Sequence, residues 1–294
     1  MYDIIIVGAG PAGMTAALYA SRANKKVAVF EANSYGGQIL NAHMVENYPG
    51  IPNISGFDLA TNMYNQVIEH TVEVKFEMVK RITRDKEVIT NSGTYKAKAI
   101  ILATGLENRK LNLPNETKFI GKGVSYCATC DGNFYKDKVV AVVGGGNTAL
   151  EDAIYLSGMC KKVYLIHRRD SFRGEEKYVE ELNNNDKIEL ILNSNVVSLN
   201  GDDKLESISI NTEDNKINVD GLFIAVGQQP KNQLFADIIS VDERGYINTE
   251  DGVHTNIDKI YVAGDARKKQ LRQLTTAVSD GSIAATVAIR EMER

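Results

Sequence analysis

The sequence predicts an α/β protein made of two Rossmann-like, three-layer dinucleotide-binding domains, with the second domain inserted into the first. A strand, a glycine-rich turn, a helix and another strand follow one another twice along the chain, as in dinucleotide-binding βαβ units. The two copies keep a constant offset, because Gly8 and Gly144 are 136 residues apart and so are Glu31 and His167. A further glycine-ended strand, KIYVAGDA at 259–266, follows only after the second copy is finished. The first fold is therefore expected to be interrupted by the second.

Composition and charge narrow the class of protein. Of the 294 residues, 43% are apolar and 24% are charged, as in globular rather than disordered chains. The net charge of −4 argues against a nucleic-acid partner, because phosphate binding needs clustered basic side chains. The most apolar stretch holds glycines and a proline, and Asp3 stands where a signal peptide carries basic residues. We therefore expect a cytoplasmic protein without a membrane segment.

The first βαβ unit opens the chain. The apolar run 4–7 is typical of a buried parallel strand, 11–23 has the small and apolar pattern of a helix, and 27–30 forms the next strand. The turn between strand and helix, GAGPAG, follows the G-x-G-x-x-G pattern, and its site residues with the acid that ends the unit are Gly8, Gly10, Ala12, Gly13 and Glu31.

Each residue type in this turn suits a bound nucleotide. Gly8 permits the tight turn, Gly10 lets the backbone approach a pyrophosphate, and Gly13 lets the helix pack closely on the strand. Glu31 suits hydrogen bonds to ribose hydroxyls. A tight turn without a ligand is the alternative, but the strand, helix and acid around it favour a nucleotide site.

The second βαβ unit has strands at 139–143 and 163–166 around a helix at 148–157. Its turn, GGGNTA, is the G-x-G-x-x-A variant. At the position of the first unit's acid it carries a basic cluster instead. The candidate site residues here are Gly144, Gly146, Asn147, Thr148, His167, Arg168, Arg169 and Arg173. Guanidinium groups bind a 2′-phosphate that an acid would repel, so this site is expected to prefer NADPH to NADH. The first site is then expected to hold FAD, although its pattern alone also allows NAD.

Each unit is closed by a later strand with a similar tail, AIILATG at 99–105 and GLFIAVG at 221–227. The two crossings between the domains are expected near 111–118 and 227–233, because both segments are polar and contain a proline. Two neighbouring crossings would form a hinge.

Cys127 and Cys130 form a C-x-x-C pair, and the chain has one other cysteine. A zinc site needs four ligands, and neither the third cysteine nor any of the four histidines stands at a recognisable ligand spacing from the pair. A structural disulfide is disfavoured in a reducing cytoplasm and in so small a ring. The pair is therefore interpreted as redox-active, with Asp131 as a candidate proton carrier or, alternatively, a turn-forming Asp-Gly with Gly132.

With these motifs in place the chain resembles the low-molecular-weight thioredoxin reductases over essentially its full length. The matching stretches, in the family's order, are GAGPAG, GGQ, ENYPG, ATG, CATCDG, GGGNTA, HRRDSFR and AGDARKKQLRQLTTAVSDG. The resemblance implies a discontinuous FAD domain at 1–113 and 241–294, around an NADPH domain at 114–240 that carries the cysteine pair.

The resemblance also implies further flavin-binding residues. These are Gly37, Gln38 and Asn47, Thr104 and Gly105 of the ATG tail, Gly264, Asp265 beside the ribitol or pyrophosphate, and Arg272, Gln273 and Leu274 along the isoalloxazine ring. For Arg272 a plain surface charge is the alternative.

The function that the resemblance implies is a relay. NADPH hands a hydride to FAD, reduced flavin cleaves the Cys127–Cys130 disulfide after one domain rotates, and the dithiol reduces thioredoxin. The family also implies a homodimer. A glutaredoxin-like or other CxxC protein as substrate stays open. A ferredoxin–NADP reductase relative is disfavoured by CATC, and a flavin-binding redox sensor by the arginine cluster.

Overall fold

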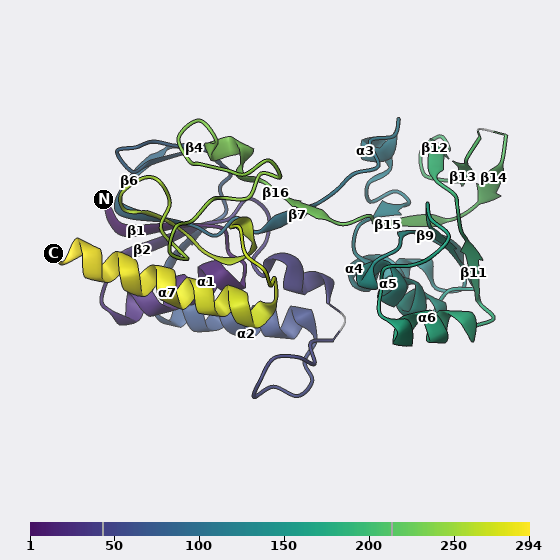
Figure 1. Ribbon diagram of the computed structural model, residues 1–294, viewed down its shortest axis with the longest axis horizontal. Helices are drawn as coiled ribbons and strands as arrows, with labels where there is room; N and C mark the ends of the chain where they lie inside the picture. Colours follow the sequence, from purple (N-terminus) through teal and green to yellow (C-terminus); the bar gives the residue numbers. More distant parts are fainter. Residues whose placement is uncertain (43, 213) are drawn as a thin grey trace. The chain divides into compact units, whose positions relative to one another are not determined.

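The computed structural model describes residues 1–42, 44–212 and 214–294. The chain divides into two compact units, Met1–Glu107 with Gln229–Arg294, and Asn108–Gln228. The second unit thus interrupts the first in sequence (Figure 1). The units exchange at 107/108 and 228/229, whereas the sequence placed the exchanges at 113/114 and 240/241.

The first unit is built on a sheet with the strand order β3-β2-β1-β6-β5-β4, and β17 pairs with β6 beside this path. Its parallel strands are β1 (Tyr2–Val7), β2 (Val27–Phe30), β3 (Glu73–Lys75), β6 (Thr94–Leu102) and β17 (Ile260–Val262), while β4 (Val79–Ile82) and β5 (Glu87–Thr90) pair antiparallel. The helices are α1 (Pro11–Arg22), α2 (Gly56–Glu69) and α7 (Leu274–Met292), with the 3₁₀ turns η1 (Gly37–Asn41), η3 (Asn232–Phe235) and η4 (Gly264–Ala266).

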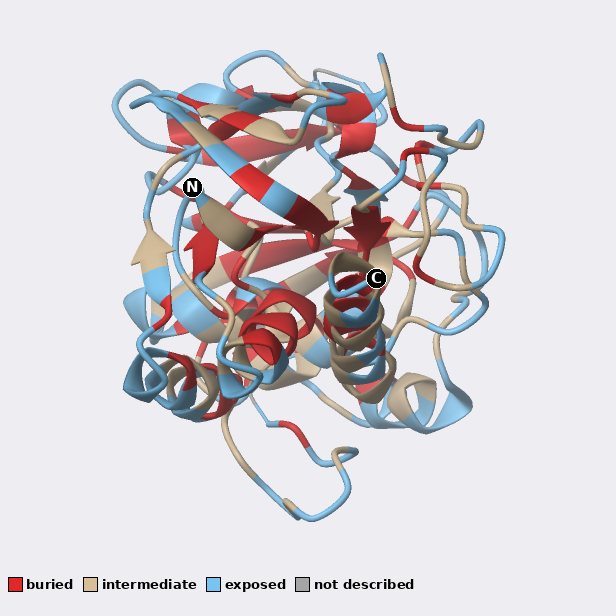
Figure 2. Cartoon of the chain, turned by 90° about the vertical axis from the view of Figure 1, so that its left-hand side faces the viewer, coloured by how far each residue is buried: buried red, intermediate tan, exposed pale blue. Residues whose placement is uncertain are grey.

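Strand β1 has apolar side chains on both faces, as expected for a parallel strand covered on both sides. Ile4 and Ile6 pack with residues of α1, α2 and α7, whereas Ile5 and Val7 pack with residues of β4, β5, η3 and the segment after η3. Figure 2 shows buried residues concentrated on the strands and on one side of the helices. The glycine turn therefore begins from a rigid, fully buried strand.

The second unit has an all-parallel sheet with the order β11-β10-β9-β15-β8. These strands are β8 (Val124–Ser125), β9 (Val139–Gly144), β10 (Lys162–Ile166), β11 (Ile188–Ile191) and β15 (Gly221–Ala225). Its helices are α3 (Glu116–Phe119), α4 (Ala128–Asp131), α5 (Asn147–Ser157) and α6 (Glu176–Asn183), with the turn η2 (Gly132–Tyr135). An antiparallel sheet is formed by β12 (Val196–Asn200), β13 (Ser207–Ile210) and β14 (Lys216–Asn218).

This unit has three layers. Val140 and Val142 of β9 pack with α4, α5 and α6, whereas Ala141 and Val143 pack with residues of β12 and β13. The alternating side chains of one parallel strand thus fill two cores, as in other sheets covered on both faces. The fold class predicted from the sequence is confirmed.

The chain passes between the units along β7 (Leu106–Asn108) and β16 (Gln228–Pro230), which pair with each other. The amide of Arg109 donates to the carbonyl of Gly227 at 2.9 Å. The two crossings are thus hydrogen-bonded neighbours. Strand β16 lies within the predicted linker 227–233, whereas β7 ends before the predicted linker 111–118.

Within the described residues, no helix is both long and apolar enough to cross a membrane.

Candidate functional site

The first glycine turn separates the roles that its pattern predicts. A Cβ on Gly8, which has φ +108°, would lie 2.3 Å from the carbonyl oxygen of Ala103, and one on Gly13 would lie 1.9 Å from that of Gly8. A Cβ on Gly10 would meet its nearest neighbour only at 4.0 Å. Gly8 and Gly13 are therefore needed for packing, while Gly10 leaves space beside the start of α1 for a close ligand.

The start of α1 and Glu31 complete this turn. No side chain caps the helix at Gly10, so its first amides remain available to an anion. Glu31 Oε2 accepts from the amide of Ala9 at 2.9 Å, and its Oε1 accepts from the amide of Asn33 at 2.9 Å. These bonds orient the carboxylate at the carboxyl end of β2 and leave each oxygen a further lone pair for a hydroxyl donor.

Ala12 lies inside the unit rather than on the ligand side of the turn. It is buried, and a Cβ added to Gly281 of α7 would lie 2.2 Å from its carbonyl oxygen. A Cβ on Gly264 would lie 2.8 Å from its own Cβ. Its small size therefore lets α7 and η4 approach the glycine turn.

The other residues of the predicted flavin site lie in loops around this turn. Gln38 donates to the carbonyl of Leu106 at 2.9 Å, and Thr104 donates to the side chain of Asn232 at 2.9 Å. A Cβ on Gly37 would lie 3.2 Å from Gly10 Cα, so the two glycines face each other closely. Nothing lies within 4 Å of a Cβ placed on Gly105, which has φ +61°.

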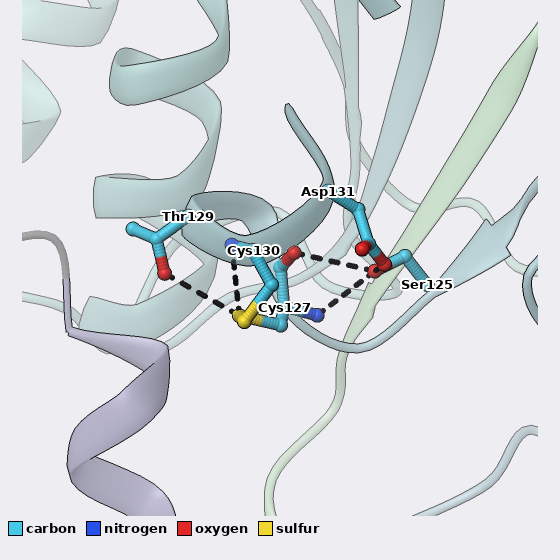
Figure 3. The surroundings of a disulfide bond; sticks show 5 residues. All are labelled: Ser125, Cys127, Thr129, Cys130 and Asp131. Carbon is cyan, nitrogen blue, oxygen red and sulfur yellow. Dashed lines mark hydrogen bonds between the residues drawn. A yellow bond between two sulfur atoms is a disulfide. The ribbon is translucent and has the colours of Figure 1, made fainter. Parts of the chain in front are cut away.

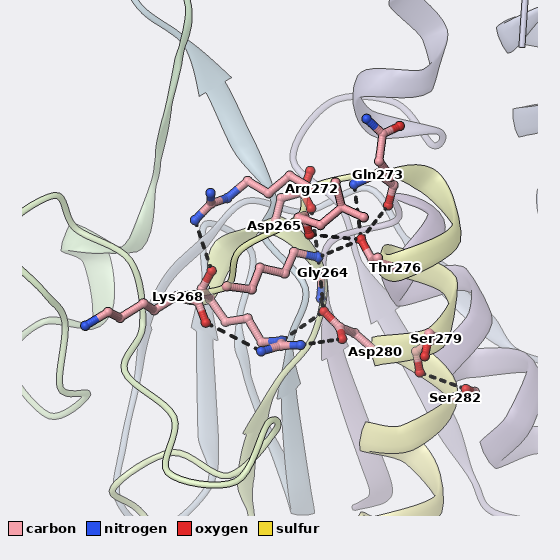
Figure 4. Close-up of polar contacts among 12 residues, drawn as sticks. Gly264, Asp265, Lys268, Arg272, Gln273, Thr276, Ser279, Asp280 and Ser282 are labelled. Carbon is pink, nitrogen blue, oxygen red and sulfur yellow. Dashed lines mark hydrogen bonds and ion pairs between the residues drawn. The ribbon is translucent and has the colours of Figure 1, made fainter. Parts of the chain in front are cut away.

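Asp265 belongs to a cluster of alternating charges between η4 and α7 (Figure 4). Lys269 Nζ lies 3.0 Å from Asp265 Oδ1 and 3.2 Å from Asp280 Oδ2. Arg267 donates to Asp280 through Nε at 2.9 Å and Nη2 at 2.7 Å, and the amide of Gly264 donates to Oδ2 at 3.1 Å. The buried Oδ1 of Asp265 receives no bond of hydrogen-bond geometry from the described residues, which leaves acceptor capacity for a ligand.

Arg272, Gln273 and Leu274 lead into α7. The guanidinium of Arg272 lies 4.0 Å from the ring centroid of Tyr246, and its buried Nε has no hydrogen-bond partner among the described residues. Gln273 caps α7 in a reciprocal capping box with Thr276, and its Oε1 accepts from Asn47 at 3.2 Å. Arg272 is thus a stacked, half-buried side chain rather than a free surface charge.

The second glycine turn has one feature that the sequence pattern did not reveal. A Cβ on Gly145 would lie 2.1 Å from the imidazole of His167, so the middle glycine is needed for this ring. His167 is buried, stacks on Phe172 at 5.4 Å, and leaves Nε2 without a partner among the described residues. Burial lowers the pKa of His167. The ring is therefore a neutral support beneath the turn.

Gly146 and the helix that follows it offer a second open anion site. A Cβ on Gly146 would find nothing within 4 Å, and no side chain caps α5. Thr148 is exposed in the first turn of that helix. Asn147 is engaged on both sides, because its Nδ2 donates to Glu175 at 2.8 Å and its Oδ1 accepts from the Glu175 amide at 2.8 Å.

The arginine cluster, Arg168, Arg169 and Arg173, is joined to the glycine turn by a backbone hydrogen bond, while its side chains extend into solvent. The amide of Arg173 donates to the carbonyl of Gly145 at 2.8 Å. Arg168, Arg169 and Arg173 are exposed, and none forms an ion pair with a described carboxylate. Three unpaired guanidinium groups beside an uncapped helix start suit a phosphate-bearing nucleotide.

The cysteine pair lies at the start of α4 as a disulfide (Figure 3). Cys127 is half-buried and Cys130 is exposed. Cys127 Sγ accepts from the amide of Cys130 at 3.1 Å and lies 3.3 Å from Thr129 Oγ1. Hydrogen bonds at a helix start favour a thiolate over a thiol, so Cys127 has the better-stabilised sulfur once the disulfide opens.

Asp131 is held by Ser125, a residue that sequence reasoning missed. Ser125 Oγ donates to Asp131 Oδ2 at 2.6 Å and accepts from the amide of Cys127 at 3.0 Å. Gly132 follows in a right-handed helical conformation, with φ −54° and ψ −37°. Asp131 therefore ends α4 and, through Ser125, fixes the backbone of Cys127.

Sequence reasoning also missed two buried polar residues, Asn232 and Glu116. Asn232 is fully buried and donates to the carbonyls of Gly245 at 2.9 Å and Ala266 at 2.8 Å. Glu116, also buried, accepts from Tyr126 Oη and from the amides of Leu111 at 3.1 Å and Leu113 at 3.3 Å. The sequence gives no signal for either role, because nothing in it shows that these two polar side chains are buried.

A zinc site at the cysteine pair would need further ligands beside the two sulfurs. Within 1–42, 44–212 and 214–294, no three His, Cys, Asp or Glu side chains gather as a metal site would require. His43, one of the histidines considered as a ligand, lies outside the described residues.

Comparisons with known proteins agree with this geometry. Residues 2–281 match the family model of the pyridine nucleotide-disulphide oxidoreductases. A thioredoxin reductase of Mycoplasma genitalium is 40% identical over 99% of this chain and 95% of its own length. The crystal structure of Lactococcus lactis thioredoxin reductase (FR conformation) has a TM-score of 0.89 at 38% identity, covering 99% of this chain and 98% of that one. The crystal structure of T. acidophilum thioredoxin reductase has a TM-score of 0.88 at 34% identity, covering 100% of this chain and 99% of that one.

The chain belongs to the pyridine nucleotide-disulphide oxidoreductase family. Its similar relatives within that family are thioredoxin reductases, so the resemblance predicted from the motifs is confirmed. The predicted cofactors, FAD and NADPH, are those of this group of oxidoreductases. The open glycine turns, the uncapped helix starts and the unpaired arginines fit such nucleotides.

Proposed function

We propose that the chain is an NADPH-dependent flavoprotein reductase whose Cys127–Cys130 pair reduces the disulfide of a thioredoxin. The observation that carries the proposal is an exposed C-x-x-C disulfide in the same unit as an arginine-ended nucleotide turn. The sequence-similar thioredoxin reductases support the choice of substrate.

The nucleotides are assigned by charge. The unit with Glu31 and Asp265 would hold FAD, and the unit with Arg168, Arg169 and Arg173 would hold NADPH through its 2′-phosphate. When bound, NADPH supplies a hydride and FAD relays its electron pair, chemistry that the side chains of this chain do not possess. His167 would support the turn from below rather than contact the 2′-phosphate.

The exchange step follows from the exposure of the two sulfurs. In the dithiol form, the exposed Cys130 thiolate attacks one sulfur of the substrate disulfide, and that disulfide breaks and releases a thiolate, which takes a proton. Cys127 Sγ, stabilised by the Cys130 amide and Thr129, then attacks Cys130 Sγ in the mixed disulfide. The second substrate thiol leaves, and the Cys127–Cys130 disulfide is restored. The substrate gains the two electrons and two protons that the dithiol loses.

Asp131 has a defined place in this step. Its carboxylate is bonded to Ser125, which also holds the Cys127 amide. Through Ser125 it holds the Cys127 backbone in place, and we assign its carboxylate the exchange of protons with the sulfurs of the opened pair.

The remaining features of the proposal concern the setting of the enzyme. We infer a cytoplasmic homodimer that acts on a protein disulfide and has no nucleic-acid partner. A low cysteine content and a pair used for reduction suit a reducing compartment. The net charge of −4 offers no basis for binding nucleic acid.

The test follows electrons through the purified, FAD-loaded protein. Anaerobic NADPH should bleach the flavin absorbance, and oxidised thioredoxin should then restore it while free thiols appear on thioredoxin. The Cys130→Ser variant should still bleach with NADPH but should lose thioredoxin reduction. Bleaching of the wild type without recovery on adding thioredoxin would exclude thioredoxin as the substrate, and recovery with a glutaredoxin-like protein instead would reassign the partner.

A further inference from the structure

Lys269 is an unusually buried lysine. Only 5% of its side chain is exposed, and its ammonium lies between two carboxylates, 3.0 Å from Asp265 and 3.2 Å from Asp280. It also donates to Thr276 Oγ1 at 3.3 Å. Burial of an ammonium is costly unless it is paired and hydrogen-bonded, so a lysine at this place must be compensated by these contacts.

The two carboxylates around Lys269 are held differently. Asp280 has four donors, namely the Gly264 amide, two nitrogens of Arg267, and Lys269 itself. Among the described residues, Oδ1 of Asp265 has the ammonium of Lys269 beside it, which approaches outside hydrogen-bond geometry. Asp280 would therefore keep its position without Lys269, whereas Asp265 would lose the contact that holds it.

Lys269 also links two elements. Asp265 belongs to η4, Lys269 follows four residues later in the loop, and Asp280 belongs to α7. The two carboxylates are matched by the two cations Lys269 and Arg267, so each buried charge in the cluster has a partner of opposite sign. The lysine thus anchors a carboxylate whose own acceptor sites remain available.

We propose that Lys269 is a positioning residue for the flavin nucleotide, acting through Asp265. It holds that carboxylate in place while Asp280 holds Lys269. The proposal rests on the assignment of FAD to the unit that contains Asp265. Lys268 supplies a matched control, because this neighbouring lysine is exposed and points away from the cluster (Figure 4).

The experiment measures FAD binding to the full-length apoprotein by the quenching of flavin fluorescence. Lys269→Met is expected to weaken FAD binding about tenfold or more, the usual scale for the loss of a charge-assisted contact, while Lys268→Met should stay within about twofold of wild type. FAD affinity unchanged in Lys269→Met would overturn the proposal.

A double-mutant cycle separates positioning from a merely structural role. If Lys269 acts through Asp265, Lys269→Met should cause no further loss of FAD affinity in an Asp265→Asn background. Equal losses in the presence and absence of the Asp265 carboxylate would show that Lys269 only supports the fold. Lys269→Met alone leaves one carboxylate of the cluster without a cation and could unfold the protein. The double variant removes that carboxylate as well, so it can still be tested. It must then bind FAD as tightly as Asp265→Asn does.

The outcome is independent of the substrate. A wild-type protein that binds FAD but cannot reduce thioredoxin would refute the proposed function and leave the role of Lys269 standing. If the wild-type protein reduces thioredoxin and Lys269→Met keeps full FAD affinity, the proposed function stands and the role of Lys269 is refuted.

Discussion

Position 145 must be a glycine because the imidazole of His167 occupies the space that a Cβ would need. The sequence predicted the glycine turn at 144–146 and placed His167 at its edge, and the structure puts both there. The motif could not show that the imidazole lies against Gly145, because the burial of the ring depends on its stacking with Phe172. Patterns in sequence locate a turn more reliably than they orient the side chains around it.

Gly145→Ala is expected to destabilise the protein by about 2 kcal/mol or more, because its Cβ would lie 2.1 Å from the His167 ring. Adding His167→Ala removes the obstacle, so the double variant should be more stable than the sum of the two single losses predicts. Urea unfolding of all four proteins measures this coupling. If the losses in the free energy of unfolding simply add, the alanine at 145 does not collide with the His167 ring.

The arginine side chains can be tested against the nucleotide they are expected to distinguish. Arg168→Gln with Arg169→Gln should weaken NADPH binding by about 10- to 100-fold and leave NADH binding within about threefold, since only NADPH carries the 2′-phosphate. Binding to the purified protein is followed by the fluorescence of the reduced nicotinamide. Arg244→Gln, an exposed arginine in the other unit, serves as control. Equal losses for both nucleotides would separate these arginines from the phosphate.

At the scale of elements, apolar runs located the strands of the two βαβ units, whereas the parallel strands β3, β8 and β11 were not predicted. The predicted strand 27–30 coincides with β2, and the predicted 139–143 and 163–166 differ from β9 and β10 by one residue at one end. These strands are continuous apolar runs bounded by glycine or charge, a signal that depends on local sequence alone. The antiparallel sheet of β12, β13 and β14 was not foreseen, because its short strands alternate weakly and are defined by pairing with one another.

Helix α3 carries a buried carboxylate that fastens the start of the second unit to the redox segment. Glu116 accepts from the amides of Leu111 and Leu113 and from Tyr126, the residue before Cys127. Burial and this bond raise the pKa of Tyr126, so the hydroxyl remains a donor. Glu116→Ala would leave three half-buried donors without this acceptor.

We therefore expect Glu116→Ala to lower the free energy of unfolding by about 3 kcal/mol, and Tyr126→Phe by about 1 kcal/mol. The matched control is Glu181→Ala on the exposed face of α6, for which a change within about 0.5 kcal/mol is expected. Chemical denaturation of the isolated variants measures all three. A loss for Glu116→Ala no larger than that for Glu181→Ala would mean that water satisfies the freed amides.

The far end of α7 is held by a histidine between two carboxylates. His254 Nδ1 lies 2.7 Å from Asp251 and its Nε2 lies 2.9 Å from Glu291, which also accepts from Tyr261. The bond to Glu291, with that to Asp251, raises the pKa of His254. The imidazolium therefore stabilises the fold fully below the ordinary pKa of about 6.5, and the contribution is lost as pH rises through the raised value.

His254→Gln is accordingly expected to destabilise the protein more at pH 6 than at pH 8.5. Urea midpoints at the two pH values measure the difference, with His70→Gln, an exposed histidine after α2, as control. A larger loss at the higher pH would contradict a charged histidine in this clamp.

At the scale of the whole molecule, the insertion of one fold into another was visible in the order of the motifs. A glycine-ended strand arriving after the second βαβ unit could only complete the first. The points of exchange were harder to place, because proline-containing polar segments mark loops in general, whereas β7 and β16 are defined by their pairing with each other. Because the two crossings lie side by side, the chain ends of each unit are close together, and each unit can form a continuous fold without the other.

This closure allows the two nucleotide sites to be separated physically. The unit Asn108–Gln228 is continuous in sequence and has its own two cores, so as a fragment it is expected to unfold cooperatively and to bind NADPH in preference to NADH. In the other unit, Gln229 Nε2 donates to Glu107 Oε1 at 3.3 Å, so a short glycine linker can join Met1–Glu107 to Gln229–Arg294. This shortened chain should bind FAD and show no preference for NADPH.

Circular dichroism establishes folding, and fluorescence titration establishes which nucleotide each fragment binds. FAD bound by the fragment 108–228, or NADPH by the rejoined unit, would reverse the assignment of the two glycine turns and with it the path of electrons to the cysteine pair.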